Sequence, residues 1–345
     1  MKIAIITDQH FGVRKSDKNF HNYFKKFYDN VFFPTLMERG ITNLVDMGDT
    51  FDNRKYIDIW ALKWSKQNYY DQLSDMGVKV HTVVGNHTAY YKNTNSVNSV
   101  DLLMREYDNI EIYSEVTSRN IGGLDILFVP WINKDIWDDS ISKIKKDSST
   151  VVMGHLELNG FSPYKGHVMT EGMDCNVFDG YKKVFSGHYH TKSDNGTVYY
   201  LGNPYQLYWN DVNDSRGFHI FDTETLELEF IPNPYEMFKV VEYEDTPHQL
   251  YKYNECFEKY VRLVVKKKTN VRLFEKFFDK LSDSNPFELK VIDEVEVADC
   301  DDEVLESEGT VAILDKYIEN AEIDLNKNRL KSLIQTIYKE ASEIE

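Results

Sequence analysis

Short apolar runs alternate with longer amphipathic segments over the first two-thirds of the chain. Apolar runs rich in Ile, Val, Leu, Phe and Tyr predict buried strands at residues 2–8, 43–49, 78–85, 124–130, 150–155, 182–188 and 197–202. Segments between them, such as 18–38 and 58–76, repeat their apolar residues with the period of a helix. Strands that alternate with helices in this way predict an α/β fold.

The pattern changes in the last third of the chain. Residues 217–232 predict a β-hairpin that turns at Asp222–Thr225. Residues 260–268, 272–283 and 287–297 then predict a strand, a helix and a strand, which together form a small β-α-β-like unit. The chain is therefore expected to contain a second, smaller domain.

An acidic stretch and two amphipathic helices follow. Residues 293–308 contain nine acidic side chains and no basic one, so this stretch repels itself and should be extended. Helices are predicted at about 310–321 and 326–342, each with a single apolar stripe. The resulting division is a core domain at 1–235, a capping domain at 236–297, an acidic linker at 298–309 and a helical segment at 310–345.

Composition narrows the class of protein. The 345 residues, of which 41% are hydrophobic, can form a large core. Acidic residues outnumber basic ones by 57 to 40, giving a net charge of −17, which argues against a free-standing nucleic-acid binder. It does not exclude a DNA enzyme whose metals or partner supply positive charge. Three scattered cysteines fit a reducing cytoplasm and exclude a cysteine-type zinc site, and no apolar run approaches the ~20 residues of a membrane span.

Five of the predicted strands end in Asp, Asn or His, mostly beside a glycine. These strand ends carry Asp8 with His10, Asp49 with Asp52, Asn86 with His87, His155, and His188 with His190. Ligands of open α/β sheets gather beyond the carboxyl ends of strands. Oxygen and imidazole donors without thiolate suit Mn²⁺, Fe²⁺ or Zn²⁺. A set of this size exceeds the needs of one ion and suits two ions bridged by a carboxylate, which activate a water and clamp a phosphoryl group.

Each motif alone has a structural alternative. Asp-x-His and Gly-Asp are common in turns, and Gly-Asn-His also fits an Asx turn with a surface histidine. Gly-His-x-His is stronger, because alternate residues of an extended segment place both imidazoles on one side. The five motifs in this order, each after an apolar run, favour the metal site. The other histidines, for which core or surface positions are expected, are His21, His81, His167, His219 and His248.

The order of these motifs resembles that of the calcineurin-like metallophosphoesterases. The stretches "DQHFG" and "GDTFD" are similar to those of SbcD-type nuclease subunits of DNA break-processing complexes, including their relatives in T-even-like bacteriophages. Further similar stretches are "VPW" (129–131), "GHLELNGF" (154–161) and "GFHIFDTETLELEFIPN" (217–233). The resemblance covers the whole chain. It implies a four-layer α/β sandwich with a small α+β capping domain and a C-terminal helical tail.

The resemblance also implies roles for the strand-end residues. It implies one ion held by Asp8, His10 and His190, a second held by Asn86, His155 and His188, and Asp49 as the bridge. His87 would face the substrate as an acid at the leaving oxygen, a role that imidazole can fill. Asp52 would hydrogen-bond His87 and fix its tautomer. Mn²⁺ is the expected metal, with Mg²⁺, Fe²⁺ or Zn²⁺ as alternatives.

Two positions near these motifs need separate interpretation. The family usually has Asp or Glu where this chain has Thr88. We interpret Thr88 as a support of the loop, since a Thr hydroxyl can bond to backbone. Arg54 either contacts a substrate phosphate or forms a surface salt bridge.

The activity implied by the resemblance is that of a two-metal DNA nuclease in DNA break processing, recombination and repair. It would act as a 3′–5′ exonuclease on duplex ends and as an endonuclease. A phosphatase or cyclic-nucleotide phosphodiesterase has the same metal site and is the alternative enzyme. A catalytically idle scaffold is a third possibility, against which the complete ligand set argues. The run from Lys266 to Lys268 favours DNA, although a solvated strand end also explains it.

The resemblance implies an SbcC-type, SMC-like ATPase as partner, bound by the C-terminal helices. The apolar stripes that would make this contact include Leu314, Ile318, Leu330, Leu333, Ile334 and Ile337. Folding of these helices back onto their own domain is the alternative. Duplex DNA is the expected second partner, and a homodimer within a heterotetramer is the expected assembly. No membrane contact is expected, and the predicted location is cytoplasmic, that of the host cell if the protein is phage-encoded.

Overall fold

The computed structural model describes residues 1–163, 168–170, 172–293, 318, 327 and 329–330. The chain divides into two compact units. The first comprises Met1–Lys239, Cys256–Tyr260 and Asn285–Glu288, and the second comprises Val240–Glu255, Val261–Ser284 and the chain from Leu289. The predicted acidic linker and most of the predicted helical tail lie outside the described residues.

The first unit is built on two six-stranded sheets. One has the order β12-β11-β1-β2-β3-β4, with β1, β2, β3 and β4 parallel and the hairpin of β11 and β12 antiparallel beside β1. Its strands are β1 (Lys2–Ile6), β2 (Asn43–Asp46), β3 (Lys79–Val83), β4 (Ile110–Tyr113), β11 (Gly217–Asp222) and β12 (Leu228–Pro232).

The other sheet has the order β5-β6-β7-β8-β10-β9, with β6, β7, β8 and β10 parallel and an antiparallel strand at each edge. Its strands are β5 (Thr117–Ile121), β6 (Leu124–Val129), β7 (Val151–His155), β8 (Lys183–Gly187), β9 (Ser193–Asp194) and β10 (Val198–Tyr200).

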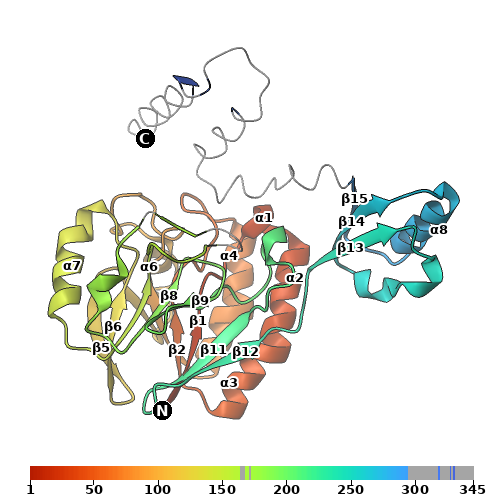
Figure 1. The fold of residues 1–345 in the computed structure, drawn as a ribbon. Coiled ribbons are helices and arrows are strands. Elements are labelled where there is room, and N and C mark those ends of the chain that lie inside the picture. Colours follow the sequence, from red (N-terminus) through yellow and green to blue (C-terminus); the bar gives the residue numbers. More distant parts are fainter. Residues whose placement is uncertain (164–167, 171, 294–317, 319–326, 328, 331–345) are drawn as a thin grey trace. The chain divides into compact units, whose positions relative to one another are not determined.

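Helices cover the outer face of each sheet, which gives four layers (Figure 1). The helices of the first unit are α1 (Val13–Ser16), α2 (Lys18–Phe27), α3 (Phe33–Arg39), α4 (Ile59–Ser65), α5 (Asp71–Asp75), α6 (Ser99–Leu103) and α7 (Trp137–Lys146). Single π-helical turns at Tyr28–Phe32 and Lys66–Tyr70 join α2 to α3 and α4 to α5. Short 3₁₀ turns lie at Lys134–Ile136, Cys175–Phe178, Trp209–Asp211, His248–Leu250 and Tyr253–Cys256.

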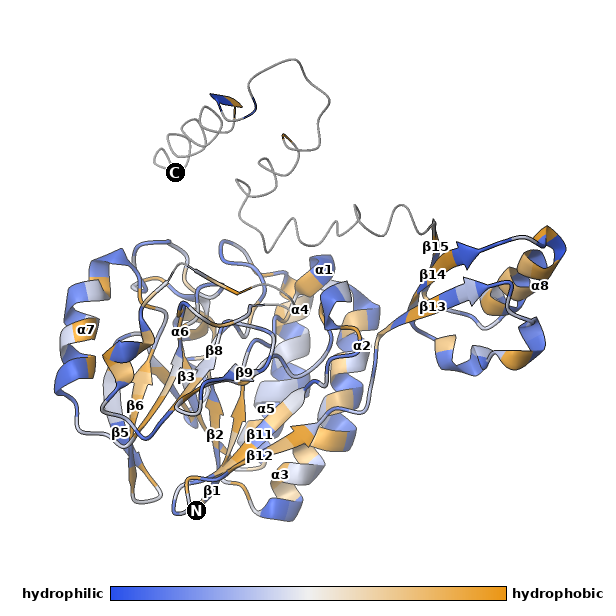
Figure 2. Ribbon diagram, in the orientation of Figure 1, coloured by the Kyte–Doolittle hydropathy of each residue, from blue (hydrophilic) through white to orange (hydrophobic). Residues whose placement is uncertain are grey.

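Three hydrophobic clusters hold these layers together. In β1, Ile3 and Ile5 pack between the two sheets, whereas Ala4 and Ile6 pack against the helices of the first sheet. A third cluster packs α7 against the second sheet. After its first residue, β1 is apolar on both faces, as a parallel strand under helices requires, while polar residues gather on the outer helix faces (Figure 2). The fold is thus the four-layer α/β sandwich that the motifs imply.

In its described residues up to 293, the second unit contains a three-stranded sheet and one α-helix. The sheet has the order β13-β14-β15, formed by β13 (Phe238–Glu244), β14 (Tyr260–Lys267) and β15 (Glu288–Asp293). Helix α8 (Val271–Ser282) begins after Asn270, whose side chain accepts a hydrogen bond from the Leu273 amide at 3.1 Å. The assignment of residues 236–297 as a capping domain stays a prediction.

The three lysines of β14 and its end are engaged within this unit. Lys266 pairs with Glu242 at 2.7 Å, and Lys267 lies 3.7 Å from Asp245. The ammonium group of Lys268 lies 3.9 Å from the centre of the Phe274 ring. These contacts give the lysine run a structural explanation that does not need DNA.

All seven strands predicted before residue 203 are present, but most end earlier than predicted. The chain leaves the sheet before Asp8, His10, Asp49 and His188, which have positive φ values between 49° and 83°. Strands β4, β5, β9 and β13 were not predicted, because they are short, lie at edges or carry polar residues. Among the described residues, no helix has the length and apolarity needed to cross a bilayer.

Candidate metal centre

Glycines allow the ends of β2, β3 and β7 to approach one another closely. A Cβ atom on Gly85 would lie 2.2 Å from Oδ1 of Asp49, and one on Gly48 would lie 2.7 Å from Nδ1 of His155. Neither distance is compatible with a side chain. The space that these glycines leave empty is occupied by candidate ligands from a different strand end.

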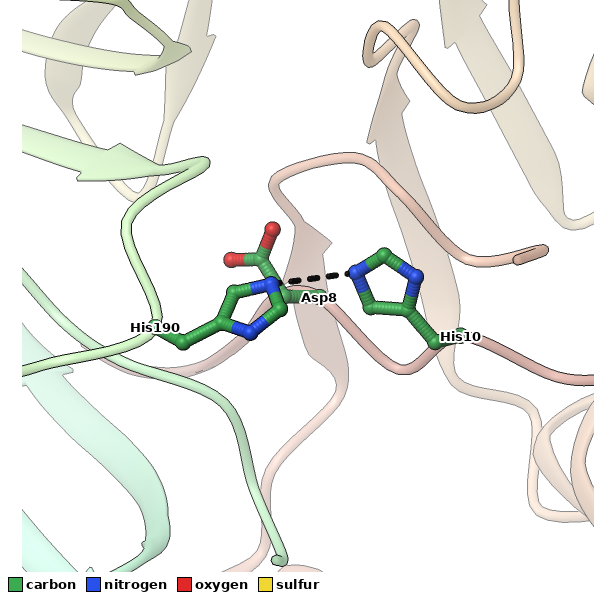
Figure 3. Close-up of side chains that lie close together, drawn as sticks. All are labelled: Asp8, His10 and His190. Carbon is green, nitrogen blue, oxygen red and sulfur yellow. Dashed lines mark hydrogen bonds between the residues drawn. The ribbon is translucent and has the colours of Figure 1, made fainter. Parts of the chain in front are cut away.

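Asp8, His10 and His190 form the first ligand group. Their potential ligand atoms all lie within 4.8 Å of one another. Figure 3 shows the two imidazoles turned toward one another, with Nε2 of His10 3.2 Å from Nε2 of His190. Both carboxylate oxygens of Asp8 accept the amide N–H of His188 at 3.1 Å, which ties this group to the segment after β8.

Asp49, His155 and His188 form the second group, again with ligand atoms within 4.8 Å. Nε2 of His155 lies 3.1 Å from Oδ2 of Asp49 and 2.8 Å from the side-chain oxygen of Asn86. Nδ1 of His155 donates to the main-chain carbonyl of Met47 at 2.9 Å. This bond orients the ring so that Nε2 faces the group, as second partners of metal-binding histidines do.

The electrostatics of both groups fit bound divalent ions. Burial lowers the pKa of His188 to about 3 and holds the pKa of His190 well below its usual value, so both rings are neutral donors. Burial raises the pKa of Asp8. For Asp49 the effect of burial is outweighed by His155 and His87, which hold its pKa well below the usual range. A set of buried carboxylates and imidazoles without thiolate matches a hard or borderline cation.

The structure corrects the role predicted for the Asp52 carboxylate. Its Oδ1 lies 3.1 Å from Nδ1 of His10, so the carboxylate orients a candidate metal ligand. Nδ1 of His87 instead donates to the main-chain carbonyl of Asp52 at 2.6 Å. His87 is oriented by residue 52 as expected, but through backbone that any residue could supply. The carboxylate is already engaged by His10, which is why it does not serve His87.

Thr88 has the role that its hydroxyl predicted. The side chain is buried, accepts the N–H of Gly85 at 3.0 Å and donates to the carbonyl of Gly85 at 3.0 Å. These two hydrogen bonds close the loop that carries Asn86 and His87.

Within the described residues, Arg54 does not form the surface salt bridge that was the alternative prediction. Its guanidinium carbon lies 5.3 Å from the ring centre of Trp131. Its Nη1 atom is buried and, within the described part of the chain, has no hydrogen-bond partner.

A buried polar network supports the ligand loops from inside, and the sequence motifs did not reveal it. Asp46 accepts hydrogen bonds from the Gln9 side chain at 2.9 Å, the Thr50 hydroxyl at 2.9 Å and the Gly48 amide at 3.2 Å. Burial raises the pKa of Asp46 to about 7, against the opposing effect of these bonds. Gln9 also accepts the Tyr28 hydroxyl at 2.5 Å. The available signal was an acid directly after the apolar residues Leu44 and Val45.

Arg216 is a second support that the motifs did not reveal. One guanidinium nitrogen donates to the main-chain carbonyl of His190, and another pairs with Asp211 at 2.7 Å and with Asp214 at 2.9 Å. Arg216 and Asp211 are nearly fully buried. This ion pair holds the backbone of a candidate ligand.

The remaining predicted residues take no part in these groups. His21 and His81 are buried and hydrogen-bonded, His219 is buried, and His167 lies outside the described residues. Of the predicted partner contacts, Ile318 and Leu330 are helical. Leu314, Leu333, Ile334 and Ile337 lie outside the described residues.

This chain is similar to several known proteins. The profile of the calcineurin-like phosphoesterases matches residues 1–192, which include both ligand groups. Exonuclease subunit 1 of Enterobacteria phage T4 is 32% identical over 360 residues, covering 99% of this chain and 100% of that protein. An archaeal phosphodiesterase structure is 13% identical, with a TM-score of 0.34, over 68% of this chain and 100% of its own. A dimetal phosphatase structure from Danio rerio is 10% identical, with a TM-score of 0.39, over 64% of this chain and 91% of its own.

Replacing Gly85 by Ala is expected to remove at least one of two bound metal ions. The new Cβ would lie 2.2 Å from Oδ1 of Asp49 and would push this carboxylate away from His155. The measurement is elemental analysis after equilibration with Mn²⁺ and removal of free metal. Gly180→Ala is the matched control, since its Cβ would meet nothing within 4 Å. Two ions in the Gly85→Ala protein would contradict this assignment.

Metal affinity is expected to rise with pH through the neutral range. Burial opposes a charge on His155, but Asp49 and Asp8 outweigh it and raise its pKa to about 9. Below that pH the ring keeps a proton that a metal must displace, so affinity should increase about tenfold per pH unit. Titration of Mn²⁺ at pH 6.5 and 8 in buffers of different ionisation heat measures both affinity and proton release. Equal affinity at both pH values, with no proton released, would show that His155 is not a ligand.

Proposed function

The chain belongs to the calcineurin-like phosphoesterase family, and from this we propose that it is a two-metal DNA nuclease. It hydrolyses DNA phosphodiester bonds as a 3′–5′ exonuclease on duplex ends and as an endonuclease. The observation that carries the proposal is the pair of ligand groups, each of three residues whose potential ligand atoms lie within 4.8 Å of one another. The whole-length similarity to a protein named exonuclease subunit 1 supports DNA as the substrate.

The proposed ligand assignment follows the two groups. Asp8, His10 and His190 hold one ion; Asn86, His155 and His188 hold the other, with Asp49 between them. Mn²⁺ is the proposed metal, with Mg²⁺, Fe²⁺ or Zn²⁺ as alternatives. When bound, such a pair supplies a water of lowered pKa and positive charge at the phosphoryl oxygens.

His87 is proposed as the acid that serves the leaving oxygen. Its ring centre lies 4.9 Å from that of His10, and its own N–H donates to Oδ1 of Asp49 at 2.8 Å. Because Nδ1 is bonded to the carbonyl of Asp52, Nε2 is the nitrogen available to substrate. A protonated Nε2 can donate to the oxygen as the phosphodiester bond breaks. Asp52 acts on the site through two contacts, its carbonyl on His87 and its carboxylate on His10.

The main rival is a phosphatase or cyclic-nucleotide phosphodiesterase, which would use the same ligand groups. Incubation with Mn²⁺ and end-labelled duplex DNA, beside a phosphomonoester and a cyclic nucleotide, separates these activities. An idle scaffold would cleave none of them while still binding a partner.

A partner ATPase is also proposed. The T4 relative is named a subunit, which supports a partner chain. An SbcC-type, SMC-like ATPase bound by the C-terminal helices, within a heterotetramer of two copies each, is the form we propose. A phage-encoded relative favours the host cytoplasm as the location.

His87→Ala is expected to retain two metal ions and to lose most DNA hydrolysis, about a hundredfold or more. His87 contacts the ligand groups without belonging to either. Metal content by elemental analysis and nucleotide release from end-labelled duplex are measured on the same preparation. His248→Ala, a histidine of the second unit, is the control. Loss of a metal equivalent from His87→Ala would overturn the role given to this residue.

Removal of residues 309–345 is expected to leave a metal-loaded nuclease that no longer co-purifies with its ATPase. Leu333→Glu with Ile337→Glu should have the same effect in the full chain, because two charges would enter an apolar contact. Binding is measured by co-elution. Unchanged affinity of either variant would exclude the tail as the main docking element.

A further inference from the structure

Two arginines of the first unit lie over aromatic rings beside the candidate metal centre. The guanidinium carbon of Arg54 lies 5.3 Å from the ring centre of Trp131. That of Arg14 lies 6.0 Å from the ring centre of Tyr208. We call these pairs the Trp131 ledge and the Tyr208 ledge. An aromatic face holds a guanidinium by cation–π attraction and fixes the plane of the group.

The Trp131 ledge is attached to the loops of the second ligand group. The amide of Trp131 donates to the carbonyl of Val84 at 2.8 Å, two residues before Asn86. Arg54 follows Asp52, whose carbonyl holds His87. Burial lowers the pKa of Arg54 while Asp49 acts in the opposite direction, so the guanidinium is within electrostatic reach of that carboxylate.

Arg54 also has an unsatisfied donor. Its Nη1 is buried and lacks a hydrogen-bond partner among the described residues. A buried donor without a partner destabilises the folded state. An oxyanion would satisfy it, and phosphate matches the geometry of a guanidinium.

The Tyr208 ledge is attached to the first ligand group. The Tyr208 ring stacks on the His190 ring, with centres 5.9 Å apart and planes inclined by 9°. Arg14 lies over the Tyr208 ring and also 5.7 Å from the ring centre of Phe20. The arginine is exposed, so its outer face can meet a ligand from solvent.

The backbone that carries Arg14 is strained. Arg14, Lys15 and Ser16 follow one another at φ values of 55°, 55° and 62°, and none is glycine. The left-handed conformation is unfavourable for residues that carry a Cβ atom. The Ser16 amide closes the turn on the carbonyl of Gly12 at 2.9 Å. Strain of this kind gathers at ligand sites, and here it fixes the residue that lies over the Tyr208 ring.

We propose that the two ledges bind the backbone phosphates on either side of the phosphodiester that is cleaved. The inference rests on the proposed function and defines its substrate as a polynucleotide strand that extends across the metal centre. Phosphate contacts position a strand without reading its bases, so no base preference is expected from them. The ledges also separate this site from that of a small-molecule phosphatase, whose substrate has no flanking phosphates.

The test compares a polymer with a small diester. Arg14→Gln and Arg54→Gln should each raise KM for circular single-stranded DNA about tenfold, the effect of one lost charged contact. The same variants should change the hydrolysis of bis(p-nitrophenyl) phosphate much less. Each should also lower the slope of log Kd against log salt by about 0.7. Lys145→Gln with Lys146→Gln, an exposed pair at the end of α7, is the control and should change none of these.

The outcomes are distinct. Equal losses on DNA and on the small diester would overturn the proposal, as would an unchanged KM and salt slope. A parent protein that cleaves the diester but not DNA would instead overturn the proposed function. Release of a 3′-terminal nucleotide engages a flanking phosphate on one side only, so only one of the two variants should impair it. Equal impairment by both would contradict their placement on opposite sides.

Arg14→Gly provides a second measurement, which does not require a glutamine to adopt the left-handed conformation at position 14. Glycine adopts the left-handed conformation without cost, so the thermal midpoint should rise while KM for DNA also rises. A lower midpoint would show that the turn is not strained and would remove this support.

Discussion

The close approach of strand ends at three glycines is the constraint on which the rest of the site depends. The three glycines are Gly48, Gly85 and Gly187. At Gly187, which ends β8, a Cβ atom would lie 2.0 Å from the Thr7 hydroxyl and 3.0 Å from Oδ2 of Asp8. Gly48 and Gly85 follow strands of one sheet and Gly187 ends a strand of the other. Only without these side chains can loops from both sheets meet, so both ligand groups exist because of this packing.

A second layer of contacts keeps these loops from relaxing. The Asp46 carboxylate binds both the Gln9 side chain and the Thr50 hydroxyl, and so links the loop after β1 to the loop after β2. Arg216 holds the segment of His190 by donating a hydrogen bond to its main-chain carbonyl. Polar groups in a buried site are costly unless satisfied, and the Asp46 carboxylate is satisfied by groups of the loops that carry the ligands. The site is therefore organised before a metal binds.

Much of the fold and the identity of the strand-end residues could be predicted from sequence, because apolar runs and glycine-flanked Asp, Asn and His are local signals. The grouping of residues was not local: His10 and His190 are 180 residues apart, and only the family resemblance paired them. The error at Asp52 has a similar cause. The order of the motifs does not indicate whether the carboxylate or the main-chain carbonyl of Asp52 faces the His87 ring. Asp46 belongs to none of the motifs. The unpaired nitrogen of Arg54 can be recognised only once the burial of the atom is known.

The central claim is that the two groups hold two ions with Asp49 between them. Anomalous diffraction from a crystal of the full chain equilibrated with Mn²⁺, collected at the manganese edge, tests it most directly. The account predicts two anomalous peaks per chain about 3.5–4 Å apart, one against Asp8, His10 and His190 and one against Asn86, His155 and His188. A single peak, or two peaks that do not share the Asp49 carboxylate, would contradict it.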